Sequence, residues 1–256
     1  MLKHLALLTS FIITGLCGQV AAQDLESQLK TEGTVALAKA AAAQGDAQRG
    51  AVVFYQQYMA CTKCHLAGDK PSPLGPDLSK IGKQATNENL IESILDPAKV
   101  IKQEFVPVTV ETDEGKSIVG LLAEETKDML VLRDPSRDGK LIKIPKDSID
   151  VRVAEKLSIM PSGQVNSLAS RQQFLDLVRY LIEIRDGGPA KALALEPPPA
   201  LYAARPLPEY EKNIDHAGMI SSLDSSSLKR GAAIYERVCA NCHGTVDKPG
   251  SLPNSL

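Results

Sequence analysis

The sequence predicts a mainly α-helical protein that carries a small antiparallel β-sheet, an α+β fold overall. Apolar residues recur at helical spacing in 87–95 and 170–185, whereas they alternate with polar residues between about 104 and 153. A Cys-x-x-Cys-His segment also occurs twice, at 61–65 and at 239–243. Each of these three observations predicts a separate part of the organisation.

The composition is that of an ordinary soluble protein. Of the 256 residues, 43% are hydrophobic and 23% are charged, which excludes collagen-like, disordered and multi-span membrane proteins. The formal net charge of −2 lacks the excess of lysine and arginine that a phosphate-binding surface needs, so we expect no nucleic-acid partner. Only 4% of the residues are aromatic and tryptophan is absent, so the core is short of large flat side chains. A bound flat group would fill that role.

The first residues have the pattern of a secretory signal peptide, expected at 1–22. An apolar run at 5–16 is followed by small residues at 20–22, which predicts a mature start near Gln23 and an exported or periplasmic protein. An uncleaved anchor is the alternative, but the run is too short and too interrupted for a stable membrane span. Cys17 is expected to leave with the signal.

The rest of the chain divides into four segments. We expect a helical leader at 23–45, a helical domain at 46–186 with the β-rich insertion at about 104–153, a proline-rich linker at 187–223, and the start of a second, incomplete domain at 224–256. The second domain is inferred from an internal repeat, because 230–235 ahead of Cys239 resembles 49–54 in the first domain.

Capping residues and apolar spacing place the first helix of the domain. Asp46 is suited to cap a helix that carries Gly50, Val53, Phe54 and Tyr58 toward the first cysteine segment. A further, short helix is expected at 87–95, ending before Pro97.

The last helix of the domain is bounded on both sides. Ser170 and Gln173 have the spacing of a capping box at its start, and Gly187 with Gly188 predicts its end.

Strands are expected within the insertion. Val106, Val108 and Val110 alternate with polar residues, and Pro107 makes this an edge strand because proline cannot donate to a ladder. Further strands are expected at 117–122, 129–133 and 140–144, which suggests a small antiparallel sheet or barrel ending near Val153.

The two cysteine segments have the spacing at which haem is attached covalently. Two cysteines three residues apart lie on one side of a helical turn, and the histidine that follows can then reach the iron of a macrocycle bound to both sulfurs. The sequence predicts two haem c groups, one at Cys61, Cys64 and His65 and one at Cys239, Cys242 and His243. Disulfides or a zinc site are the alternative for four cysteines in an exported protein.

These segments resemble class I cytochrome c, and residues 46–186 resemble a bacterial haem-binding domain family that carries a β-rich insertion. The resemblance implies the cytochrome c fold and electron transfer. In that fold a glycine and an aromatic residue of the first helix pack against the last helix. Gly50 matches the glycine, while Phe54, Tyr55 and Tyr58 are candidates for the aromatic residue.

The resemblance also implies further residues around the first haem. Pro76, in the Gly75–Leu78 turn, would accept the N–H of the proximal histidine through its carbonyl, unless the turn is an ordinary proline turn. Met160, in the loop before the last helix, would be the sixth ligand on the far face. Met59 lies too close to the cysteines for that role, and Met129 lies in an expected strand. The expected iron ligands are His65, Met160 and His243.

The second haem has no such ligand downstream, since the residues after His243 include neither Met nor His. We therefore expect either a fragment of a longer protein or a ligand supplied from upstream by His216 or Met219.

A di-haem carrier of single electrons between redox partners, with no substrate turnover of its own, is the favoured function. A haem-bearing acceptor module of a larger dehydrogenase differs from it only in the partner. A di-haem peroxidase-like enzyme would need an open iron position with acid and base groups nearby, and His216 is the single histidine between the two cysteine segments.

Overall fold

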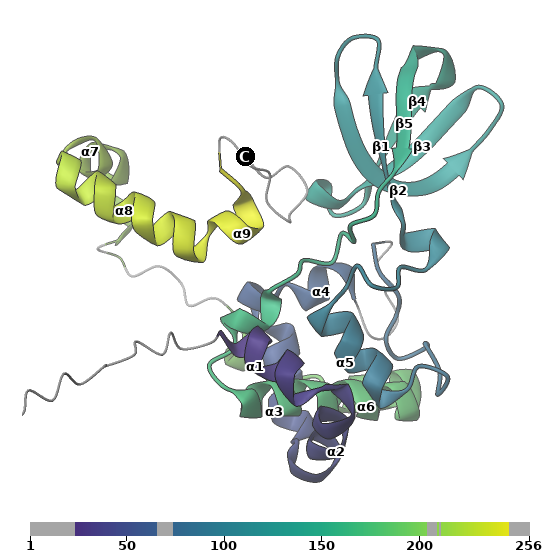
Figure 1. Cartoon of the computed structure of the whole chain (residues 1–256), viewed down its shortest axis with the longest axis vertical. Helices are drawn as coiled ribbons and strands as arrows, with labels where there is room; N and C mark the ends of the chain where they lie inside the picture. The colour runs from purple at the N-terminus through teal and green to yellow at the C-terminus, as the bar shows by residue number, and fades with distance from the viewer. Residues whose placement is uncertain (1–23, 66–73, 204–208, 210, 246–256) are drawn as a thin grey trace, which may run out of the picture.

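The computed structural model describes residues 24–65, 74–203, 209 and 211–245 (Figure 1). The signal peptide expected at 1–22 lies outside these residues. The α-helices are α1 Leu25–Glu32, α2 Thr34–Gln44, α3 Ala47–Tyr55, α4 Cys61–Cys64, α5 Asn87–Leu95, α6 Arg171–Ala194, α7 His216–Ser221, α8 Ser225–Val238 and α9 Ala240–His243. The strands are β1 Pro107–Thr112, β2 Ser117–Glu125, β3 Met129–Asp134, β4 Lys140–Pro145 and β5 Ile149–Ala154. This confirms the predicted α+β fold class.

The N-terminal leader belongs to the helical core. Gly33, at φ 84°, breaks it into α1 and α2, because that backbone conformation suits a residue without a Cβ. Leu29, Leu37 and Ala41 are buried in the same cluster as residues of α3, α5 and α6. The leader therefore covers the core of the domain that follows it.

The crossing of α3 and α6 is the most extensive helix contact in this core. Asp46 caps α3 as expected, accepting a hydrogen bond from the Arg49 backbone N–H at 2.9 Å. A Cβ on Gly50 would lie 1.9 Å from the carbonyl oxygen of Asp176, so only glycine lets the two backbones approach this closely. The rings of Phe54 and Tyr180 pack one turn further on, with centroids 5.2 Å apart.

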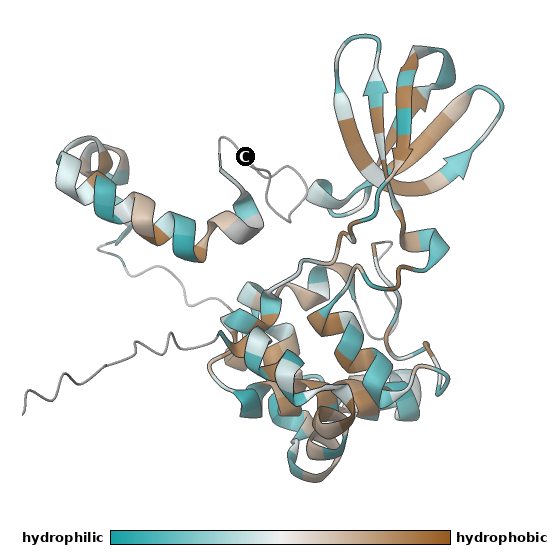
Figure 2. Cartoon of the chain, in the orientation of Figure 1, coloured by the Kyte–Doolittle hydropathy of each residue, from teal (hydrophilic) through white to brown (hydrophobic). Residues whose placement is uncertain are grey.

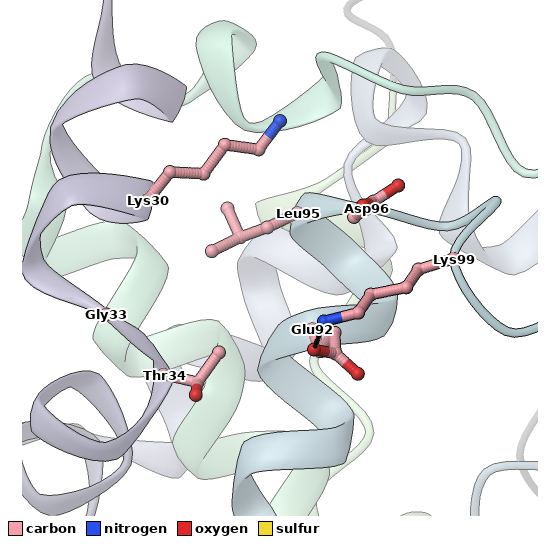
Figure 3. Close-up of a pocket in the computed structure, with 7 residues that line it drawn as sticks. All are labelled: Lys30, Gly33, Thr34, Glu92, Leu95, Asp96 and Lys99. Atoms are coloured by element: carbon pink, nitrogen blue, oxygen red, sulfur yellow. Dashed lines mark hydrogen bonds and ion pairs between the residues drawn. The ribbon is translucent and has the colours of Figure 1, made fainter.

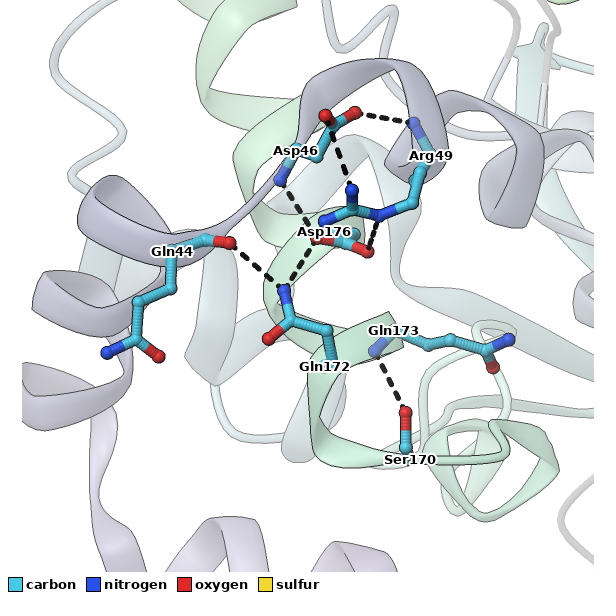
Figure 4. Close-up of polar contacts among 7 residues, drawn as sticks. All are labelled: Gln44, Asp46, Arg49, Ser170, Gln172, Gln173 and Asp176. Atoms are coloured by element: carbon cyan, nitrogen blue, oxygen red, sulfur yellow. Dashed lines mark hydrogen bonds and ion pairs between the residues drawn. The ribbon is translucent and has the colours of Figure 1, made fainter.

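A buried carboxylate holds the polar side of this crossing (Figure 4). Asp176 accepts hydrogen bonds from Arg49 Nε at 2.8 Å, Arg49 Nη2 at 3.0 Å and the Asp46 backbone N–H at 2.8 Å. Gln172 Nε2 donates to the same carboxylate at 2.9 Å. Burial alone would raise the pKa of Asp176, but these hydrogen bonds outweigh it and lower the pKa. The charged side chain is therefore paired as burial requires.

Two details of the helices differ from expectation. Tyr58 does not lie on α3, because the helix ends at Tyr55 and Tyr58 falls in a 3-10 turn where it is 54% exposed. The capping box of α6 is incomplete: Ser170 Oγ accepts from the Gln173 N–H, but Gln173 Oε1 accepts from Ala169, one residue before the cap.

The five strands form an antiparallel sheet in the order β4-β3-β2-β1-β5. The expectation of an edge position for Pro107 was wrong, since β1 pairs with both β2 and β5. Pro107 is tolerated because it is the first residue of the strand, and its carbonyl accepts from the Glu155 N–H at 2.8 Å. The fifth strand was not predicted, and its residues from Asp150 to Ala154 are all exposed.

The sheet has an apolar cluster of its own, separate from the helical core. Its buried members are Val108, Val110, Leu130, Leu132 and Ile144. Figure 2 shows apolar and polar positions interleaved along the strands. The insertion can therefore be stable without borrowing the packing of α3 and α6.

The first part of the segment expected as an extended linker at 187–223 packs on the helical domain. Gly188 breaks the helix at φ 68° as expected, but helical turns resume and Ala192 is 1% exposed. Further on, Tyr202 packs on Tyr55 with ring centroids 5.1 Å apart. Gln56 Nε2 donates to the carbonyl of Leu201, the residue before Tyr202, at 3.1 Å. Aromatic contact outweighs the extended tendency of the prolines here.

No helix among the described residues is long and apolar enough to cross a membrane.

Replacing Gly50 by alanine should destabilise the fold, because the added methyl group collides with the α6 backbone. We expect Gly50→Ala to lower the free energy of unfolding by about 3 kcal/mol in urea denaturation. Gly231→Ala is the matched control, since nothing lies within 4 Å of a Cβ there, and it should have no destabilising effect. Equal losses in both variants would contradict the close crossing.

The acid response of the sheet should depend on Glu125. Hydrogen bonds from Arg152 of β5 and from Lys146 lower the pKa of Glu125 from its ordinary 4.5 to about 2. Because the folded-state pKa is depressed, the stabilisation is present above about pH 4.5 and is lost as the pH falls toward 2. Glu125→Gln should therefore unfold at lower urea than the parent at pH 7, with the difference shrinking at pH 3.

Glu114→Gln is the control for this comparison. The Glu114–Lys116 pair lies within the exposed turn between β1 and β2 and makes no contact across the sheet. A difference between Glu125→Gln and the parent that is the same at both pH values would refute the role of the ion pairs.

Candidate functional site

The first cysteine segment is built as a single helical turn. Ala60 takes a left-handed conformation, φ 52°, and α4 then runs over the two cysteines. The His65 backbone N–H donates to the Cys61 carbonyl at 2.8 Å, which closes the turn. Cys61 and Cys64 are free, half-buried thiols three residues apart on this turn. The turn thus presents two sulfurs and one imidazole over a short length of chain.

The imidazole of His65 is fixed by one hydrogen bond. Its Nδ1 lies 3.0 Å from the carbonyl oxygen of Pro76. Since a carbonyl only accepts, Nδ1 carries the proton and Nε2 keeps its lone pair. Burial lowers the pKa of His65 and the bond to Pro76 opposes this only in part, so the ring is neutral at pH 7. A neutral imidazole with a free Nε2 is the form that binds a metal.

Gly75 lets the turn come this close to the histidine. A Cβ at Gly75 would lie 2.8 Å from the Cys64 carbonyl oxygen and 2.9 Å from His65 Cε1. Asp77 stabilises the turn. Its carboxylate accepts a hydrogen bond from Ser79 Oγ at 2.6 Å and forms an ion pair with Lys80. The family resemblance implied the proline carbonyl, while the steric need for Gly75 becomes visible only when the chain folds back on the ring.

The two thiols are not reactive nucleophiles in this environment. Burial raises the pKa of Cys61 to about 12, and it also raises the pKa of Cys64. Both therefore remain protonated at neutral pH. A free thiol of this kind acts as a small apolar group until it is modified.

Met160 lies in the loop between β5 and α6, half-buried against the helical core. Its backbone N–H is bonded within the loop, to Ser158 Oγ at 3.1 Å. Of the other methionines considered, Met59 is 1% exposed in the helical core and Met129 begins β3. Met160 as iron ligand remains a prediction.

The second cysteine segment repeats the local geometry of the first. Helix α8 leads into α9, and the His243 backbone N–H donates to the Cys239 carbonyl at 2.9 Å, the counterpart of the bond at His65. The Tyr235 hydroxyl donates to the Gly244 carbonyl at 2.9 Å, which ties the helix to the end of the motif. His243 itself is exposed.

The surroundings of the two segments differ. No residue of α8 is buried, and its apolar side chains are exposed, Leu228 by 57%, Ile234 by 53% and Val238 by 63%. His216 and Met219, the candidates for an upstream ligand, are also exposed on α7. Among the described residues, the first segment has a packed core around it and the second has only its helix.

A cavity of about 190 Å³ lies elsewhere, between α1, α2 and α5 (Figure 3). Its lining residues are Lys30, Gly33, Thr34, Glu92, Leu95, Asp96 and Lys99. Both lysines are paired, Lys30 with Glu26 and Lys99 with Glu92. None of the expected site residues lines it.

Comparison with known proteins gives a match in the C-terminal part of the chain. The family described as Cytochrome C1 matches residues 214–247, which include the second cysteine segment. A protein of Solanum tuberosum, "Cytochrome c1-2, heme protein, mitochondrial", is 54% identical over 28 residues. Those residues are 11% of this chain and 11% of that protein. The matched segment is thus of the cytochrome c type.

The residues of the first segment suit a covalently attached haem. Cys61 and Cys64 offer two thiols on one turn. His65 offers a neutral imidazole whose Nδ1 is hydrogen-bonded to Pro76, so that Nε2 can bind the iron. Among the described residues, no group of three or more His, Cys, Asp or Glu side chains is gathered as a zinc ion would require, which favours the macrocycle.

Substituting Gly75 should release the histidine from its single tautomer. In Gly75→Ala the new methyl group must push the turn away from the ring, which weakens the bond between His65 Nδ1 and Pro76. Nitrogen NMR of the imidazole should show one Nδ1-protonated tautomer in the parent and a mixture in the variant. An unchanged single tautomer would mean that the turn tolerates a Cβ and that the close approach is not needed.

Proposed function

We propose that this chain is an exported c-type cytochrome that carries one haem at Cys61, Cys64 and His65 and a second at Cys239, Cys242 and His243. Its function is the transfer of single electrons between redox partners in the periplasm or a comparable compartment. The observation that carries the proposal is the His65 geometry. The neutral imidazole of His65, with Nδ1 3.0 Å from the Pro76 carbonyl oxygen, directly follows the turn that carries the two thiols.

When bound, the haem supplies the one-electron couple, and the chain's own residues determine how stable each oxidation state is. The bond from His65 to the Pro76 carbonyl makes the imidazole more electron-donating. Met160, with its soft thioether, would favour the reduced iron. His65 and Met160 as the two ligands would leave no position for a substrate, which supports a carrier without turnover of its own.

The partner is a redox protein or a dehydrogenase whose electrons the chain accepts. The cytochrome c type of the C-terminal segment supports this. The repeated cysteine segments support two haems per chain, since the second turn reproduces the closing hydrogen bond of the first at 2.9 Å.

Removing one pair of cysteines should remove one haem. After export in a host that attaches haem c, Cys61→Ala with Cys64→Ala should retain about half of the colour that stays with the polypeptide in acid–acetone. Cys239→Ala with Cys242→Ala is the reciprocal variant and should retain the other half. Colour that passes wholly into the organic phase in the parent would refute covalent attachment.

Met160→Ala should change the first haem specifically. The weak near-infrared absorption of a thioether bound to ferric iron should disappear, and the reduction potential of one haem should fall, because the reduced state loses its soft ligand. Met129→Ala is the control, since that residue begins β3, and it should leave both properties unchanged. The same loss in the control, or an unchanged band in Met160→Ala, would remove Met160 from the site.

A further inference from the structure

The loop that carries Met160 is long and mostly irregular. It runs from the end of β5 at Ala154 to the cap of α6 at Ser170, and its one regular piece is the 3-10 helix Gln164–Ser167. A loop of this length samples many positions unless contacts outside it hold it. The backbone bond of Met160 to Ser158 lies within the loop and therefore cannot fix the loop relative to the cysteines.

Two side chains of the 3-10 helix reach out of the loop. Gln164 Nε2 donates to the carbonyl oxygen of Met59, two residues before Cys61. Met59 is buried in the helical core, so this bond ties the methionine loop to the start of the cysteine turn. Val165, fully buried, anchors the 3-10 helix between them.

Asn166 makes the second outward contact, with helix α1. Its Oδ1 accepts from the Glu26 backbone N–H at 2.9 Å, and its Nδ2 donates to the Glu26 carboxylate at 3.3 Å. The two bonds are reciprocal and join residues 140 positions apart. Gly163, in the left-handed region at φ 77°, supplies the turn that lets the 3-10 helix meet α1.

We propose that Gln164 and Asn166 are positioning residues that hold Met160 at the iron, with α1 acting as a clamp on the methionine loop. This rests on the proposed ligation by Met160. An external ligand binds the iron only while Met160 is released, so its apparent affinity reports the fraction of released molecules. Loosening the clamp raises that fraction without touching the haem or the methionine.

Helix α1 offers a matched control, because it has another tether that does not reach the loop. Arg171, the first residue of α6, pairs with Glu32 at the end of α1, with Nε 2.7 Å from Oε2. Because the buried Leu29 still anchors α1 in the helical core, Arg171→Ala removes a contact at the other end of α1 and leaves the Gln164 and Asn166 contacts in place.

The test is imidazole binding to the ferric, haem-loaded full chain carrying Cys239→Ala and Cys242→Ala, so that the signal comes from the first haem. We expect Gln164→Ala and Asn166→Ala each to bind imidazole about fivefold more tightly than the parent, the factor of one lost hydrogen bond. Arg171→Ala should bind as the parent does. Thermal melts of all variants separate loosening of the loop from general instability.

Imidazole affinities in Gln164→Ala and Asn166→Ala that match the parent, or that change no more than in Arg171→Ala, would overturn the clamp. Met160→Ala in the same series should bind imidazole more tightly than any of them. If it binds no more tightly than the parent, Met160 is not the ligand, which overturns the ligation itself and with it the clamp.

Discussion

The contact on which the rest of the structure depends is the crossing of α3 and α6 at Gly50. It joins residues far apart in the sequence, because the Asp176 backbone lies where a side chain at position 50 would be. The cysteine turn α4 follows α3 after a short connection, and the Met160 loop runs directly into α6. The crossing therefore sets where the two expected sides of a haem site lie relative to each other.

The β-sheet lies between these two sides in the sequence and is kept apart from them in packing. It follows α5 and returns the chain to the Met160 loop, with its own buried cluster and with Glu125 bonded across to Arg152 of β5. An insertion that is stable by itself can be accommodated without altering the α3–α6 contact. After the sheet, the bond from Gln164 to the Met59 carbonyl ties the chain back to the helical core.

Local patterns in the sequence predicted what depends on local physics. The helix caps at Asp46 and Ser170 are present. The packing of Gly50 and Phe54 on α6 and the bond between His65 and Pro76, which the family resemblance implied, are present as well. Features that depend on distant neighbours could not be read in this way. The interior place of β1 depends on pairing with β5, a strand with no buried face. Tyr202 packs on Tyr55 because α6 brings the following segment back to α3.

Intact-mass spectrometry of the chain purified from the periplasm under denaturing conditions tests the central claim most directly. Thioether bonds survive denaturation, so the mass reports haem that is covalently held. The account predicts the mass of a chain cleaved near Gln23 plus two haem groups, with no thiol left to react at Cys61, Cys64, Cys239 or Cys242. The mass of the bare polypeptide, with all four thiols reactive, would contradict it.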